Sequence, residues 1–492
     1  MPTDSTTGSI PARATRASTA NTGAVGRLLA GAAQGAALAA CAVAAALLAF
    51  GCSRETPARP NVVVVVLDTV RRDYTGCGPG ESYTPNMDSL MAEGTGFTNA
   101  WATAPWTPPS HASIFTGRLP SHHQCTAKNP MLPPEVTSLA ERLQEEGYET
   151  AAFHSNPWLT LEMTDLTRGF DVLHEETTTD MTRFDQTSQG GPEAIRNIRA
   201  WLDTRDASRP FFMFVNILEA HLPFDPPESY RRVALTDLPP EARVRTHWAN
   251  EYNSGVHPHD RINWHNVRRL YAGDVHAADA YLGTIVDELR SRGLYEEAVI
   301  IVTSDHGENL GEHGLMSHQF GVFETLLAVP LVVRAPGALR TGVRDDPTML
   351  SDLYATILDL TGTEDPDVPE HSRSLLLEPA HPDRPMIAEY SGPPYRLVDL
   401  LMDINPSLDP TRFELAHATV RVGDLRLTLS SDGRATLEDQ SLPPEKRTNM
   451  ARSDASKVRT MSALIPCIEP PPDAAPAVDE EMARWLRSLG YM

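Results

Sequence analysis

A run of valines near residue 60 constrains the fold of this chain more than any other segment. Residues 61–67 read Asn-Val-Val-Val-Val-Val-Leu, and Asp68 follows directly. A short, continuously apolar segment of this kind predicts a strand that is buried on both faces, in the middle of a parallel sheet. Because open α/β sheets bind ligands beyond the carboxyl ends of their strands, Asp68 is placed where a ligand site would form.

Three more buried strands are predicted, and helical patterns separate them. Two of these strands, over 211–218 and 299–302, also end in polar residues, at Glu219-Ala-His221 and Ser304-Asp305-His306. This alternation predicts a doubly wound α/β domain with helices on both faces of its sheet. The third strand is predicted over 329–333, and the helices over 84–94, 107–117, 137–146, from 192, 267–292 and 351–360.

The pattern changes after about residue 410. Short alternating segments over 415–422, 425–429 and 434–438 are separated by Gly-Asp and Asp-Gly turns and predict an antiparallel meander. A last amphipathic helix is predicted over 478–489. We therefore expect an α/β catalytic domain over 61–400 and a small antiparallel β subdomain with a terminal helix over 401–492. Residues 226–262 are irregular in pattern and predict an insertion or lid over the site.

The N-terminal segment predicts export. Residues 1–27 have no apolar period and are expected to be disordered, whereas the run that starts at Leu28 carries no charge up to Gly51. A segment over 28–52 of this kind is typical of a signal peptide or membrane anchor, since about 20 apolar residues span a bilayer. Lipid on Cys41, lipid on Cys52 and an uncleaved helix are all compatible with it. Lipid on Cys52 is favoured, because residues 53–60 then form a polar tether, and the protein would be a lipoprotein in the periplasm or on the cell surface.

The charge and the cysteines exclude several classes of function. Lys and Arg number 42 against 65 Asp and Glu, a formal net charge of -23, which disfavours nucleic-acid binding. An anionic substrate would therefore need positive charge from a metal. None of the five cysteines forms a CxxC pair, so a cysteine zinc site is not expected. Cys77 and Cys125 are compatible with a disulfide or with two buried thiols.

Thr107 is the predicted nucleophile. The segment over 106–118 reads Trp-Thr-Pro-Pro-Ser-His-Ala-Ser-Ile-Phe-Thr-Gly-Arg and predicts a helix whose amino end lies beside the Thr107 hydroxyl. Backbone N–H groups at a helix N-terminus favour an anion. A hydroxyl beside such a site attacks only if its proton is removed.

Polar residues at the strand ends provide a means of removing that proton. Asp68, Asp305 and His306 offer two carboxylates and an imidazole, a donor set that suits one divalent cation such as Ca, Mn or Zn. With Thr107 as a fourth ligand, the metal would lower the pKa of the hydroxyl and make it a nucleophile toward phosphorus or sulfur.

The same segments resemble the sulfatase family, a branch of the alkaline phosphatase superfamily. The resemblance covers about residues 60–450 and implies a large α/β domain with a mixed sheet flanked by helices, a small C-terminal antiparallel domain, and hydrolysis of sulfate or phosphate esters. It rests on residues 61–71, 84–88, 107–118, 147–150, 221–223, 304–314, 329–337 and 352–357.

Several positions depart from the sulfatase pattern. Thr107 stands where sulfatases carry the Cys or Ser that is oxidised to formylglycine, and threonine cannot give that aldehyde. His111 occupies the position of the arginine in the sulfatase motif. His318 occupies the position of one expected lysine, and Ser155 or Asn156 that of a second expected lysine. Thr69 stands where a second carboxylate is usual. The resemblance therefore implies direct attack by Thr107, as in the phosphodiesterases and phosphoryl-group transferases of the superfamily.

Three histidines complete the predicted site. The resemblance implies that His221 contacts a substrate or leaving-group oxygen and that His318 replaces a cationic lysine, and His111 is placed in the catalytic set with them. General acid catalysis by an imidazole contributes about 10²–10⁴-fold. A second metal bound by His221, Asp225 and His318 is a further hypothesis.

Three functions remain open on the sequence. The first is a metal-dependent hydrolase of sulfate or phosphate esters, including phosphodiesters and phosphonates, that uses Thr107. The second is an exported phosphoglycerol- or phosphoethanolamine-type transferase, and the third a binding protein that kept the fold. A single apolar run and the retained Asp68, Asp305 and His306 favour the hydrolase. The expected partners are an anionic ester substrate and, through the N-terminal anchor or lipid, a membrane.

Overall fold

The computed structural model describes residues 59–175, 190–234, 238, 242–394 and 396–466. The predicted anchor over 28–52, with Cys41 and Cys52, lies outside the described residues, and so does the predicted helix over 478–489. Within the described part of the chain, no helix is both long enough and apolar enough to cross a bilayer.

The valine run is the central strand of a mixed nine-stranded sheet. Strand β1 (Val62–Leu67) lies between β5 (Phe211–Ile217) and β6 (Val299–Thr303) and pairs with both in parallel. Strand β9 (Ala328–Arg334) is antiparallel to β6, which makes the sheet mixed. The strand order is β10-β2-β9-β6-β1-β5-β3-β4, and β11 pairs with β2. The remaining strands of this sheet are β2 Thr95–Trp101, β3 Glu149–His154, β4 Val172–Glu175, β10 Gly342–Arg344 and β11 Thr348–Met349.

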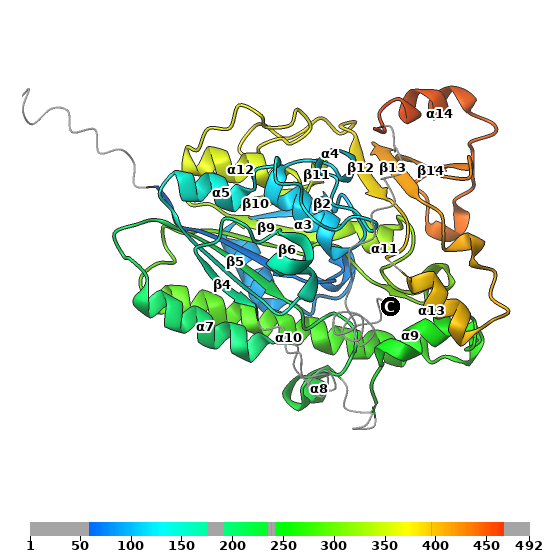
Figure 1. Cartoon of the computed structure of the whole chain (residues 1–492), viewed down its shortest axis with the longest axis horizontal. Coiled ribbons are helices and arrows are strands. Elements are labelled where there is room, and N and C mark those ends of the chain that lie inside the picture. The colour runs from blue at the N-terminus through cyan, green and yellow to red at the C-terminus, as the bar shows by residue number, and fades with distance from the viewer. Residues whose placement is uncertain (1–58, 176–189, 235–237, 239–241, 395, 467–492) are drawn as a thin grey trace, which may run out of the picture. The chain divides into compact units, whose positions relative to one another are not determined.

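Helices cover both faces of this sheet, as the alternation predicted (Figure 1). Because side chains of a strand alternate between the faces, Val62, Val64 and Val66 join one core cluster, whereas Val63 and Val65 join another. Helices α3 (Thr107–Thr116), α5 (Leu139–Glu145) and α12 (Asp352–Thr361) pack on the first face, and α2 (Pro85–Glu93), α7 (Gly191–Thr204) and α10 (Trp264–Ser291) on the second. The predicted fold class is confirmed.

A separate four-stranded antiparallel sheet follows, in the order β12-β13-β14-β15. Strands β13 (His417–Val422), β14 (Leu425–Ser430) and β15 (Ala435–Asp439) match the predicted meander within one or two residues. The sequence did not predict β12 (Met386–Tyr390), which comes from the range assigned to the catalytic domain. The Glu389 N–H donates to the Thr103 carbonyl at 2.8 Å, so β12 also joins this sheet to the α/β part.

The segment over 226–262 is more regular than its sequence suggests. It contains α8 (Glu228–Ala234), α9 (Thr246–Asn253) and a 3-10 turn, η3 (His259–Arg261). An isolated antiparallel bridge pairs Val244, inside this segment, with Phe224, which lies just before it. The remaining short elements are η1 Arg72–Tyr74, α4 Pro120–His123, η2 Pro157–Leu159, α6 Leu161–Thr164, β7 Asn309–Leu310, η4 Glu312–Gly314, β8 Met316–Ser317, α11 Glu324–Leu327, α13 Leu397–Ile404, η5 Pro410–Arg412, η6 Pro444–Lys446 and α14 Ala455–Ser462.

The two described cysteines are free thiols. Cys77 and Cys125 are both buried and form no disulfide. The sequence left open a disulfide or two buried thiols, and the structure contains two buried thiols.

Candidate active site and metal centre

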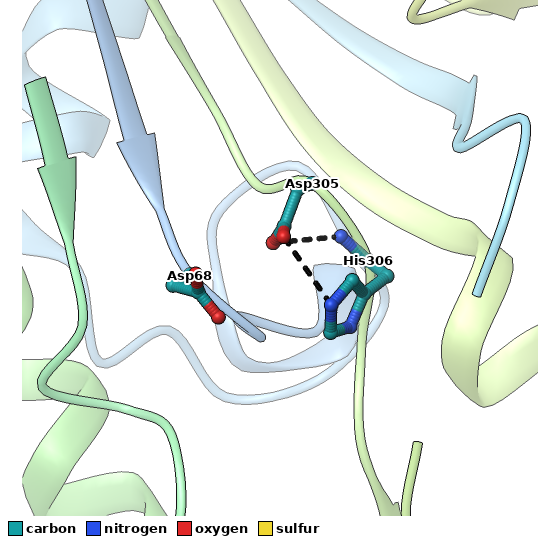
Figure 2. Close-up of side chains that lie close together, drawn as sticks. All are labelled: Asp68, Asp305 and His306. Atoms are coloured by element: carbon teal, nitrogen blue, oxygen red, sulfur yellow. Dashed lines mark hydrogen bonds and ion pairs between the residues drawn. The ribbon is translucent and has the colours of Figure 1, made fainter. Parts of the chain in front are cut away.

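The predicted metal ligands lie together at the carboxyl edge of the sheet. Asp68 follows β1, and Asp305 and His306 follow its parallel neighbour β6. All three side chains are fully buried, and one ligand atom from each lies within 4.8 Å of the other two (Figure 2). The two adjacent strands therefore bring residues 237 positions apart into one cluster, as the strand-end argument predicts.

Asp68 and Asp305 each accept hydrogen bonds with one carboxylate oxygen, and the other oxygen of each is available to bind a cation. Oδ2 of Asp68 accepts from the amides of Asn156 and Asn216 at 2.8 and 3.0 Å. Oδ1 of Asp305 accepts from the backbone N–H groups of Thr69 and His306 at 3.2 and 3.0 Å. In the described structure, Asp68 Oδ1, Asp305 Oδ2 and His306 Nε2 are buried without a hydrogen-bond partner. Outer hydrogen bonds of this kind orient metal ligands.

The tautomer of His306 strengthens the case for a cation. Its Nδ1 lies 2.9 Å from the Gly307 carbonyl, and since a carbonyl only accepts, Nδ1 carries the proton. Burial lowers the pKa of His306 to about 3, so the ring is neutral and Nε2 is a lone-pair acceptor. This Nε2 lies 3.2 Å from Asp305 Oδ2. Two acceptors at that distance need a proton or a cation between them, and two carboxylates with an imidazole fit a divalent ion.

Burial also disfavours the charged form of the carboxyl groups. It raises the pKa of Asp305 to about 7, and burial together with the charge of Asp305 raises the pKa of Asp68. The nearby Arg71 does not supply the compensating charge, because its guanidinium donates to Asp73, to Glu312 and to a backbone carbonyl. Two buried carboxylates that Arg71 does not neutralise fit a bound divalent cation, which favours their ionised form.

Thr107 lies beside this cluster as the first residue of α3. Its side chain is fully buried, and the amide of Asn156 lies 3.4 Å from its Oγ1 while donating to Asp68 at 2.8 Å. One amide therefore contacts both the predicted nucleophile and a predicted metal ligand. The hydroxyl of Ser110, one turn on, donates to the Asp305 carbonyl at 2.6 Å and fixes the helix against β6.

The expected anion site of backbone N–H groups at the start of α3 is not formed. Pro108 and Pro109 have no N–H group, and the N–H of Ser110 donates to the Trp106 carbonyl at 3.3 Å. Only the N–H of Thr107 remains among the first four residues of this helix. The prolines that stabilise the helix start thus remove the donors that the prediction required.

His111 contacts the nucleophile's backbone and not its hydroxyl. Its Nδ1 donates to the Thr107 carbonyl at 3.0 Å, and its Nε2 lies 3.5 Å from the amide of Asn216. Burial lowers the pKa of His111 to about 4, so its 3.5 Å approach to Asp305 is a contact of a neutral ring and not an ion pair. These contacts fit a residue that positions Thr107.

His221 and His318 lie side by side next to the metal cluster. Their ring centroids are 5.2 Å apart, and the ring of His318 lies 4.4 Å from that of His306. Asp225, the third predicted ligand of a second metal, lies elsewhere: its carboxylate accepts from Arg231 and pairs with Arg243 at 3.6 Å. Among the described residues, only Asp68, Asp305 and His306 form a group of three potential ligands. The structure therefore does not assemble the proposed second site.

Sequence reasoning missed two residues of the site. Asn216 lies inside β5, where its amide bonds to Asp68, and the strand pattern around it gave no sign of a role. Glu308 is fully buried, with Oε2 3.3 Å from Nδ1 of His318 and with Oε1 lacking a described partner. Burial raises the pKa of Glu308 to about 8. Its place two residues after His306, following a buried strand, was the available signal.

Comparison with known proteins agrees with this geometry. The sequence profile of the sulfatase family matches residues 60–363. An ulvan-active sulfatase of Formosa agariphila is 24% identical over 379 residues, covering 70% of this chain and 72% of that protein. Arylsulfatase K of Bos taurus is 23% identical over 498 residues, covering 89% and 88%.

The fold also matches a solved structure. The phosphonate monoester hydrolase of Agrobacterium radiobacter superposes with a TM-score of 0.64 at 22% identity, covering 82% of this chain and 96% of that one. This likeness shows that the two proteins share a fold, and the family profile spans more than half of the sequence. The chain belongs to the sulfatase family and is an ester hydrolase of that family.

Proposed function

We propose that the protein hydrolyses sulfate, phosphate or phosphonate esters with the hydroxyl of Thr107 as the nucleophile. The observation that carries the proposal is the Asn156 amide, which lies within 3.4 Å of the Thr107 hydroxyl and donates to Asp68. A buried threonine held against a metal-ligand carboxylate has little structural purpose, because an alanine or valine would fill that space without a polar group to satisfy. The names of the relatives and of the structural neighbour, which include sulfatases and a phosphonate hydrolase, support the same ester classes.

Asp68, Asp305 and His306, with Thr107 as a fourth ligand, would hold one divalent ion, Ca, Mn or Zn. Such an ion, when bound, would lower the pKa of the Thr107 hydroxyl and offset the charge of an anionic ester. The described residues around the ligand atoms include no lysine or arginine that contacts them, so the protein itself supplies little of that charge.

The residues of the chain divide the chemistry between them. Thr107 Oγ1 loses its proton and forms a bond to the sulfur or phosphorus atom, and the bond from that atom to the ester oxygen breaks. The proton lost from Thr107 balances the one that the departing oxygen gains. His221, with His318 beside it, is assigned to the leaving-group oxygen, which takes up a proton as it departs. Water then cleaves the ester on Thr107, restoring the hydroxyl. Asn156 and His111 hold Thr107 in position throughout.

The test is a comparison of esters and of Thr107 variants. The purified protein is assayed on an aryl sulfate, a phosphate monoester, a phosphate diester and a phosphonate monoester. Thr107→Ala is expected to lower kcat by about 10³-fold or more, because it removes the attacking atom, and Thr107→Ser to retain measurable activity because it keeps the hydroxyl. No activity on any ester, or equal activity in Thr107→Ala, would defeat the proposal.

Export and membrane attachment form part of the proposal. They rest on the uncharged run over 28–51 and on Cys41 and Cys52, which suit a lipid anchor or a membrane helix. Membrane fractionation of the native protein beside Cys52→Ala and Cys41→Ala tests it. Release of Cys52→Ala alone supports lipid on Cys52, and retention of both variants supports an uncleaved helix.

A further inference from the structure

A cavity of about 480 Å³ lies between the segment that precedes α10 and the first turns of α10. It is lined by residues within 242–270, and none of them belongs to the catalytic site described above. We call it the insertion pocket. Small-molecule sites in proteins usually enclose about 300–1,000 Å³, so this cavity is large enough to hold an organic ligand.

The insertion pocket is positive in a strongly negative chain. Its described lining contains Arg243, Arg245 and Arg261 and two histidines, but no Asp or Glu. The whole chain has 65 acidic and only 42 basic residues, so a lining without carboxylates is the opposite of its average surface. Such a lining favours an anion.

Nearby carboxylates compensate only part of this charge. Asp225 lies 3.6 Å from Arg243 but is bound chiefly by Arg231, and Glu251 lies 2.8 Å from the ring of His257. Arg261 is exposed and makes no ion pair with any residue that the structure describes. At least one guanidinium at the rim is therefore available to a ligand.

The inner wall of the insertion pocket is apolar. Val244, Val267 and Leu270 line it and are buried, and Trp248 stacks on His257 at 5.6 Å between ring centroids. An apolar wall below a guanidinium rim suits a ligand with a ring-shaped body and an anionic substituent, since the body gains burial and the substituent gains charge-assisted hydrogen bonds.

Val244 in the wall of the insertion pocket, and α9, which supplies His247 and Trp248 to that wall, are bonded to the segments that carry His221 and His318. Val244 exchanges two backbone hydrogen bonds of 2.8 and 2.9 Å with Phe224, three residues after His221. The side chain of Asn253 in α9 bonds to both backbone groups of Met316, two residues before His318. An occupant of the pocket would therefore contact a structure that supports the active site.

We propose that the insertion pocket binds a ring-bearing organic anion, whose sulfate, phosphate or carboxylate group contacts the guanidinium groups of Arg245 and Arg261. The anion is either a second charged group of an extended ester substrate or a separate effector. The first alternative rests on the proposed ester hydrolysis, whereas binding of the anion to the pocket involves neither Thr107 nor the metal ligands.

The experiment measures calorimetric binding of 2-naphthalenesulfonate, which has no ester to hydrolyse, to the full-length protein. The uncharged 2-naphthol serves as the ligand control. Arg261→Ala and Arg245→Ala are each expected to weaken sulfonate binding about tenfold, and Arg261→Glu more, because each removes a charge-assisted contact. Arg340→Ala, at an exposed site outside the pocket, and Thr107→Ala are expected to bind as the wild type does.

Equal binding in wild type and Arg261→Glu would overturn the proposal, and so would binding that is lost only in Thr107→Ala, which would place the anion in the catalytic site. Inhibition kinetics then identify the source of the natural anion. A probe that competes with a disulfated substrate, but not with a monosulfated one, supports a second group of the substrate. A probe that changes kcat without competing supports a separate effector. If the protein hydrolyses none of the esters, the calorimetric measurement of 2-naphthalenesulfonate binding still tests the insertion pocket.

Discussion

The amides of Asn156 and Asn216 both donate to the same oxygen of Asp68, but only Asn156 also reaches the nucleophile. The two asparagines therefore share one task and differ in a second. Asn216 orients a metal-ligand carboxylate, whereas Asn156 orients that carboxylate and Thr107 together. Substituting them one at a time distinguishes metal binding from positioning of the hydroxyl.

Asn216→Ala and Asn156→Ala are both expected to weaken metal binding about 10–100-fold, the usual effect of losing an outer-shell partner. At saturating metal, kcat of Asn216→Ala should recover toward the wild-type value, while kcat of Asn156→Ala should stay low because Thr107 has lost its contact. Metal titrations of activity give both quantities. Equal recovery of the two variants would show that the 3.4 Å contact has no catalytic role.

At the scale of residues, the sequence predicted the metal ligands that follow strands but not Asn216, which lies inside a strand. Asp68, Asp305 and His306 were predictable because each follows a continuous apolar strand, and parallel strands bring their carboxyl ends together. Asn216 was not, because it lies within β5 and only the register of β1 against β5, with Val66 beside Asn216, places it near Asp68. Glu308 was missed because its neighbour His318 lies across a hairpin that the sequence pattern does not show.

At the scale of elements, the side chain of Asn253 bonds α9 to the hairpin of β7 and β8 beside the active site. The amide of Asn253 donates to the Met316 carbonyl at 2.8 Å, and its oxygen accepts from the Met316 N–H at 2.9 Å. Asn253 is 3% exposed, so water does not readily replace these bonds. The hairpin of β7 and β8 leads directly into His318, and its position therefore depends on this helix.

Asn253→Ala is expected to cost about 2–4 kcal/mol of unfolding free energy, because it leaves two buried backbone groups without partners. Its kcat should also decrease, since His318 follows Met316 by two residues. Urea unfolding and steady-state kinetics measure the two effects. Asn405→Ala is the matched control: it removes one partly buried bond to the Ser254 carbonyl and one exposed bond from the Ser407 N–H, and should cost less. Equal losses in both variants would show that the attachment is not specific.

The prediction of elements failed where local pattern and tertiary environment diverge. Strand β12 (Met386–Tyr390) has no alternation of polar and apolar residues, because its Glu389 is buried against Ser121. Helix α9 was interpreted as irregular because Pro, Arg and His surround it. By contrast, the meander over 417–439 was predicted well, since its strands alternate and its turns contain glycine.

At the scale of the whole molecule, Glu389 joins the small sheet to the α/β part. Its two carboxylate oxygens accept from the backbone N–H and the hydroxyl of Ser121 at 2.6 and 2.9 Å. Burial raises the pKa of Glu389 from 4.5 to about 7. Because the folded state favours the protonated carboxyl, the stability that this group contributes is fully present below pH 4.5 and is lost as the pH rises through about 7.

Glu389→Gln keeps the acceptor for Ser121 but does not titrate. Relative to wild type, its unfolding free energy is therefore expected to increase between pH 4.5 and about 7 and then remain constant. The total change is at most about 3 kcal/mol. Urea midpoints measured across this range test it, with Glu445→Gln at an exposed position as the control. A difference that does not vary with pH would contradict the account of this junction.

Removal of the metal should affect stability and activity together. Chelation is expected to abolish hydrolysis and to lower the thermal midpoint, since an ion at 100 times its Kd contributes about 2.7 kcal/mol to the folded state. Restoring activity with Ca, Mn or Zn added singly would identify the effective ion. Elemental analysis should give one ion per chain, because Asp225 is occupied by Arg231. Two ions per chain would contradict the single-site assignment.

The central claim, that Thr107 attacks the ester directly, is tested most directly by trapping the esterified threonine. The wild-type protein is mixed with a rapidly reacting aryl ester, quenched in acid, digested and examined by mass spectrometry. We expect the peptide that contains Thr107 to gain the mass of one sulfuryl or phosphoryl group, located on Thr107 by fragmentation and absent from Thr107→Ala. Steady turnover that depends on the intact metal site, but leaves Thr107 unmodified under single-turnover conditions and proceeds equally in Thr107→Ala, would contradict the claim.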